Sequence, residues 1–168
     1  MISVCPTGSN YLSVGGRCYY VESVKQSSYA TAETGCVGKF PQGGRLFEPL
    51  SIEINDKVLN ASQGVLSGTA WFYIGVKRSA TVGSDYKFVS SGITVPYAIP
   101  WHSSAPSTSD STHQCVYASM SSLLWDDNTC YLSWYAICES VGHDTDLSDI
   151  KVRTYSLTFH TFSFSKVR

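Results

Sequence analysis

Charged side chains are scarce in this sequence: Asp, Glu, Lys and Arg make up 15% of its 168 residues, and the formal net charge is -1. Binding nucleic acid by neutralising phosphates requires a basic surface, so this charge balance excludes nucleic acid as the expected partner. Hydrophobic residues make up 43% and aromatic residues 13%, which is unlike the composition of disordered chains. The length is sufficient for one domain with a buried core.

Long apolar runs and common enzyme motifs are also missing. No stretch reaches the roughly 18 consecutive apolar residues of a membrane-spanning helix, so no membrane insertion is expected. The N-terminus shows no signal peptide, as expected for a mature secreted domain. The motifs G-x-S-x-G and H-E-x-x-H do not occur, and we therefore expect no enzyme.

Six cysteines are present, although none forms the close C-x-x-C pair typical of zinc fingers. They are Cys5, Cys18, Cys36, Cys115, Cys130 and Cys138. An even number of widely spaced cysteines favours three disulfides formed in an oxidising compartment. The spacing alone leaves several pairings open.

The order of predicted elements indicates an α+β fold. A hairpin is expected over residues 5–20, a helix from Ser28 to Cys36 and a second helix beginning at Ser51, because each serine can cap a helix. Later segments predict short strands, at 46–47, 71–76, 86–89, 115–117, 123–125 and 134–138. The small, polar residues of 102–112 predict a surface loop.

Taken in order, these features resemble the C-type lectin-like domain over residues 5–139. The resemblance depends on the run 71–76 (WFYIGV) in place of the family's WIGL motif, on Trp125-Asp126-Asp127 in place of WND, and on the spacing of Trp101, Pro106 and Cys115. It implies a lectin-like domain at 1–139, with two helices, two small antiparallel sheets and a long irregular loop region. Residues 140–168 would be a C-terminal extension of unknown role. The implied disulfides are Cys5–Cys18, Cys36–Cys138 and Cys115–Cys130.

The resemblance also locates a binding site and brings calcium binding into question. In sugar-binding members an EPN or QPD triplet, a nearby Glu and the WND pair hold a calcium ion that binds the sugar. Here the triplet is Ala105-Pro106-Ser107 and the Glu is replaced by His113. Calcium takes about six to eight oxygen ligands, and Ala105 offers no side-chain oxygen. A second calcium site is not expected, because its acidic positions correspond to Arg78 and Val82.

A histidine and two carboxylates, His113, Asp126 and Asp127, would suit zinc or a similar transition ion. Zinc binding, weak calcium binding and no metal binding all remain open, with the last favoured. Ser107, His113, Asp126 and Asp127 are the expected sugar-binding residues.

By this resemblance, the chain is expected to be a secreted, extracellular carbohydrate-binding lectin that recognises microbial surface glycans in innate defence. The alternative is a lectin-like protein-binding module without metal or sugar binding. The missing acidic residues favour this alternative, whereas Pro106 and the pair Asp126-Asp127 favour the lectin.

Overall fold

The computed structural model describes residues 5–79, 85–107 and 110–141. Its elements confirm the predicted α+β fold with two helices. Of the predicted extension at 140–168, the part after residue 141 lies outside the described residues. In chain order they are β1 (Tyr11–Val14), β2 (Arg17–Val21), α1 (Tyr29–Cys36), β3 (Gly44–Leu46), α2 (Ile52–Ser62), β4 (Trp71–Arg78), β5 (Tyr86–Phe88), β6 (Cys115–Ser119), β7 (Trp125–Asn128) and β8 (Tyr135–Ser140).

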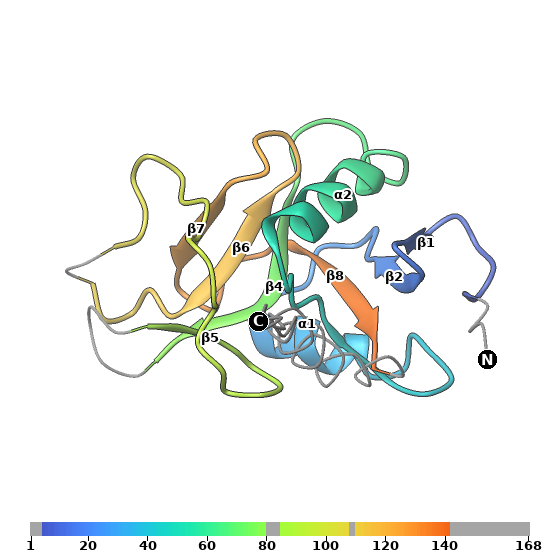
Figure 1. Ribbon diagram of the computed structural model, residues 1–168, viewed down its shortest axis with the longest axis horizontal. Coiled ribbons are helices and arrows are strands. Elements are labelled where there is room, and N and C mark those ends of the chain that lie inside the picture. The colour runs from blue at the N-terminus through green and yellow to red at the C-terminus, as the bar shows by residue number, and fades with distance from the viewer. Residues whose placement is uncertain (1–4, 80–84, 108–109, 142–168) are drawn as a thin grey trace, which may run out of the picture.

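The strands form one mixed sheet in the order β1-β2-β8-β4-β6-β7, with β3 paired to β8 and β5 to β4. Strands β1 and β7 therefore lie on opposite sides of the molecule (Figure 1). We expected two separate antiparallel sheets, but a parallel pair joins them, with Phe72 opposite Tyr135 and Tyr73 opposite Ala136. This pairing connects strands far apart in the chain, so no local pattern indicates it.

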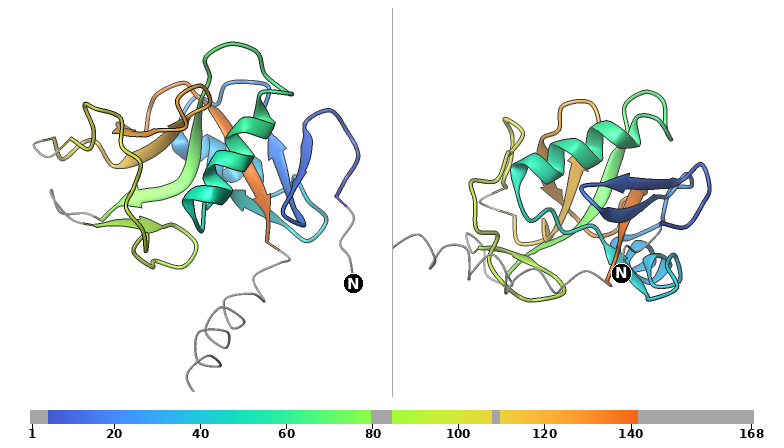
Figure 2. Two further views of the ribbon diagram at one scale, coloured as in Figure 1. Left: turned by 45° about the horizontal axis from the view of Figure 1, so that its top comes forward. Right: turned by 45° about the vertical axis from the view of Figure 1, so that its right-hand side comes forward.

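Both helices begin where the sequence predicts. The Ser28 hydroxyl accepts the N–H of Thr31 at 3.2 Å, and the Ser51 hydroxyl accepts the N–H of Ile54 at 3.2 Å. Such caps each stabilise a helix by about 1 kcal/mol. The helices cover opposite faces of the sheet (Figure 2): α1 packs with Tyr73, and α2 lies in the core that contains Phe72 and Ile74.

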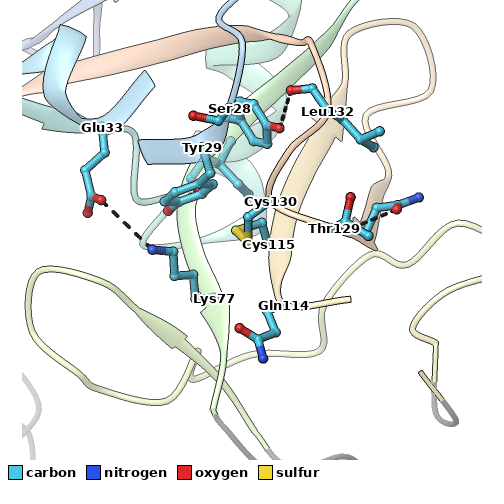
Figure 3. Close-up of a disulfide and its surroundings, with 12 residues drawn as sticks. Ser28, Tyr29, Glu33, Lys77, Gln114, Cys115, Thr129, Cys130 and Leu132 are labelled. Atoms are coloured by element: carbon cyan, nitrogen blue, oxygen red, sulfur yellow. Dashed lines mark hydrogen bonds and ion pairs between the residues drawn. A yellow bond between two sulfur atoms is a disulfide. The ribbon is translucent and has the colours of Figure 1, made fainter. Parts of the chain in front are cut away.

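The three disulfides are those that the resemblance implied: Cys5–Cys18, Cys36–Cys138 and Cys115–Cys130. Cys36–Cys138 spans 102 residues and ties α1 to β8. A ring of that size contributes on the order of 4 to 5 kcal/mol in the loop-entropy model. Cys115–Cys130 connects β6 to the turn after β7, next to the ion pair between Lys77 and Glu33 (Figure 3).

Strand β7 is fixed in the core by its first residue. Trp125 is fully buried, and its indole N–H donates to the side-chain oxygen of buried Asn55 at 2.8 Å. The strand begins later than we predicted, because Leu123 has a φ of 62° and lies in the preceding turn. As a result, Asp126 and Asp127 are strand residues, with side chains on opposite faces of the sheet.

Candidate functional site

A pocket of about 410 Å³ opens beside β7, where the long segment between β5 and β6 passes the edge of the sheet. Its lining is predominantly polar and comprises Ser104, Pro106, Ser107, His113, Asp126, Asp127 and Asn128. All four predicted sugar-binding residues therefore lie at one pocket, although they come from separate parts of the chain. Figure 1 shows this segment beyond β7, far from the β1–β2 hairpin.

Asp127 lies at the back of this pocket and is 1% exposed. One carboxylate oxygen, Oδ2, accepts from Arg78 Nη2 at 2.5 Å and from the Tyr86 hydroxyl at 3.0 Å. The other, Oδ1, accepts the backbone N–H of Ser107 at 2.7 Å. Both oxygens are thus hydrogen-bonded within the protein, and the negative charge has a cationic partner.

Arg78, the last residue of β4, supplies that positive charge from the interior. Its Nε and Nη2 donate to the Tyr86 hydroxyl at 3.0 and 2.9 Å, and Nη1 donates to the Asp110 carbonyl at 2.8 Å. Nη2 also donates to the Ser107 carbonyl. Burial raises the pKa of Tyr86 to about 12, so its hydroxyl stays protonated and donates to Asp127.

Asp126 and His113 are more accessible members of the pocket. Burial is the main cause that raises the pKa of Asp126, and the hydrogen bond from the backbone N–H of Asp127 lowers it. The His113 Nε2 atom lies 3.4 Å from a carboxylate oxygen of Asp110. Its Nδ1 atom is buried without a hydrogen-bond partner among the described residues. Because side chains alternate along β7, Asp126 is the carboxylate of this pocket that faces away from the buried pair of Arg78 and Asp127.

Comparison with known proteins identifies the family. A family model, the lectin C-type domain, matches residues 25–140. The chain belongs to the C-type lectin domain family. This confirms the resemblance found in the sequence, and the prediction of a non-enzymatic protein is confirmed with it, because the family is not one of enzymes. No curated protein sequence matches the chain significantly.

Solved structures share the fold of this C-type lectin domain. C-type lectin CEL-I from Cucumaria echinata is 18% identical, with a TM-score of 0.67 over 79% of this chain and 96% of that one. Human lithostathine is 20% identical, with a TM-score of 0.66 over 79% and 98%. A calcium-independent type II antifreeze protein is 25% identical, with a TM-score of 0.65 over 82% and 94%.

The pocket residues of this lectin domain do not fit a calcium ion. Asp127 is already paired with Arg78, and Ala105 contributes no side-chain oxygen. Within the described part of the chain, no three His, Cys, Asp or Glu side chains form a group that could hold a metal. Zinc binding by His113, Asp126 and Asp127 stays a prediction, and it would require Asp127 to exchange Arg78 for the ion.

Sequence reasoning did not assign Arg78 and Tyr86 to the site. A signal for Arg78 was present, because side chains alternate along a strand and Ile74, Val76 and Arg78 share one face. Trp125 and Asp127 alternate in the same way. A charged residue on each inward face indicates a buried ion pair, but not which acid pairs with which base.

No helix in the described ranges is long and apolar enough to cross a membrane.

Proposed function

We propose that this C-type lectin domain binds carbohydrate in the pocket beside β7, through direct hydrogen bonds and without a bridging calcium ion. The observation that carries the proposal is the convergence of Ser107, His113 and Asp126 on one open polar pocket in a member of a lectin family. Three disulfides further support a secreted, extracellular protein. We propose microbial surface glycans in innate defence as the ligand class.

The pocket offers sugar hydroxyls both acceptors and donors. The Asp126 carboxylate would accept hydrogen bonds from one or two hydroxyls, each contributing about 1.5 to 3 kcal/mol because the acceptor is charged. The Asn128 amide and the His113 ring lie at the same pocket and would set the orientation of the ring. Asp127 would not contact the sugar but would position Ser107, because its Oδ1 accepts the backbone N–H of Ser107 at 2.7 Å.

A relative supports recognition without calcium. The antifreeze protein with the same fold at 25% identity is calcium-independent by name, so this fold does not depend on calcium in every protein that has it. In this chain the cation next to Asp127 is an arginine. Sugar binding by Asp126 and its neighbours would therefore require no metal.

A glycan array, probed in excess calcium and in excess EDTA, tests this proposal. We expect binding to microbial glycans that is equal in both conditions and is lost in Asp126→Asn, which keeps the size of the side chain. Asp85→Asn serves as the matched control, because Asp85 is exposed and does not line the pocket. Absence of binding to every glycan would favour the alternative, a protein-binding module. Binding that EDTA abolishes would contradict direct recognition.

Zinc-dependent recognition is a second hypothesis, supported by the Nδ1 atom of His113, which is buried at the pocket without a described partner. Here His113, Asp126 and Asp127 would be the ligands, and they would have to move together on binding, because in the structure they do not form a metal-binding group. Calorimetric titration of zinc into the wild type and His113→Ala tests it. Weaker zinc binding by the variant would support the site, and equal affinity would remove His113 from it.

A further inference from the structure

Arg78 is a buried positive charge with an unusually complete shell of oxygen atoms. Its residue is 7% exposed, and its side chain is 3% exposed. The guanidinium contacts the Tyr86 hydroxyl, the carbonyls of Ser107 and Asp110, and the Asp127 carboxylate. These oxygens come from β5, from two parts of the segment between β5 and β6, and from β7. One side chain of β4 thus connects β5, the segment between β5 and β6, and β7.

This arrangement has the chemistry of a cation site. A hard metal ion in a protein is held by carboxylate, carbonyl and hydroxyl oxygens drawn from separate segments, and it orders the loops that supply them. The same three kinds of oxygen surround Arg78. A guanidinium differs from an ion in carrying five N–H donors in a fixed plane, and in being covalently attached and always charged.

We infer that Arg78 is a built-in cation that does the work of a bound metal ion in this pocket. It holds the segments 102–107 and 110–113 against β7 through the Ser107 and Asp110 carbonyls, and it neutralises Asp127. The Ser107 N–H, which donates to Asp127, completes the connection. The pocket therefore keeps its shape without calcium. This inference concerns the ordering of the pocket and is independent of which ligand binds there.

Two variants of neighbouring residues test the inference. Arg78→Met keeps an unbranched apolar stem and removes the guanidinium with its charge, whereas Lys77→Met makes the same kind of change one residue earlier, on the opposite face of β4. The Lys77 side chain is 39% exposed and lies 4.0 Å from Glu33, away from the pocket. The readouts are the thermal unfolding midpoint in excess calcium chloride or EDTA, and hydrogen exchange of the amides in 102–107 and 110–114.

We expect the wild-type midpoint to be the same in calcium and in EDTA. Arg78→Met should lower it by about 10 °C, because Asp127 is left buried without its partner, and Lys77→Met should change it little. Exchange should increase at the Ser107 amide and its neighbours in Arg78→Met, while the β1–β2 hairpin stays protected.

Other outcomes would overturn the inference. A lower wild-type midpoint in EDTA than in calcium chloride would show that a metal orders the pocket. Equal exchange in Arg78→Met and Lys77→Met would show that Arg78 does not order these segments. If Arg78→Met fails to fold, Arg78→Lys keeps the charge and loses the planar donors. Faster exchange confined to 102–107 and 110–114 in that variant would support the inference, and unchanged exchange would refute it.

Discussion

Two buried carboxylates on different sides of this lectin domain each pair with an arginine, and they differ in how completely the acid is hydrogen-bonded. At the pocket, both oxygens of Asp127 have partners from Arg78, Tyr86 and Ser107. On β8, Glu139 accepts from Arg45 Nε at 2.8 Å through one oxygen, and its Oε2 atom is buried with no hydrogen-bond partner in the part of the chain that the structure describes.

Arg45 also serves a second acid. Its Nε lies 3.8 Å from a carboxylate oxygen of Glu48, which is itself buried and accepts from both the N–H and the hydroxyl of Ser90. Burial is the main cause that raises the pKa of Glu139 to about 7, and the charge of Glu48 adds to it, whereas Arg45 lowers it. The ion pair with Arg45 therefore does not offset the effect of burial on the Glu139 carboxyl.

The largest expected effect is at the pocket. Asp127→Ala leaves Arg78 buried without its counter-charge, and we expect the free energy of unfolding to fall by about 3 to 5 kcal/mol. Urea unfolding at neutral pH measures this loss. Asp85→Ala, on the exposed surface, is the control. A loss below about 1 kcal/mol in Asp127→Ala would mean that the pocket pair stabilises the domain no more than an exposed pair does.

The other pair should make stability depend on pH. The pKa of Glu139 is about 7 in the folded protein and near its ordinary value of 4.5 in the unfolded chain. The folded state thus holds this proton more tightly, so the contribution is fully present below pH 4.5 and is lost as the pH rises through 7. The total is on the order of 3 kcal/mol.

Comparison of the wild type with Glu139→Gln isolates this contribution. In the wild type, the free energy of unfolding in urea should fall by about 3 kcal/mol between pH 5 and 8. In the variant it should fall much less. Glu53→Gln, at an exposed position, should keep the wild-type pH dependence. Parallel curves for wild type and Glu139→Gln would show that Glu139 is not the titrating group.

A smaller effect should come from the neighbouring acid. Glu48→Gln removes a negative charge that raises the pKa of Glu139, so the pH at which stability is lost should move downward. The same urea series measures the shift. An upward shift would mean that Arg45 binds Glu139 less closely once Glu48 is neutral.

Deletion of residues 141–168 should have the smallest effect on both pairs. Cys138 closes the last disulfide, and β8 ends at Ser140. Of the backbone hydrogen bonds between described residues, the deletion removes the one from Val141 N–H to the Gly43 carbonyl at 3.2 Å. We expect a cooperative thermal transition close to that of the full chain. Loss of that transition would show that the extension belongs to the core.

Much of this fold could be predicted because its signals are local or belong to the family pattern. The serines at 28 and 51 cap their helices, the family resemblance implied the cysteine pairing, and the motif around Trp125 placed Asp126 and Asp127 at the pocket. Strand boundaries were less accurate, since Leu123 has an apolar side chain but a turn conformation. A pattern of side chains does not reveal a positive φ.

Through its resemblance to the family, the sequence determined the lectin fold, the three disulfides and four of the residues that line the pocket. Tertiary structure alone decided the parallel pairing of β4 with β8, the engagement of Asp127 by Arg78, and the incomplete hydrogen bonding of Glu139. Periodicity tells which face of a strand is buried, but pairing and hydrogen-bond satisfaction depend on distances between residues far apart in the chain. For that reason Asp127, a predicted metal ligand, proved to be the partner of an arginine 49 residues earlier.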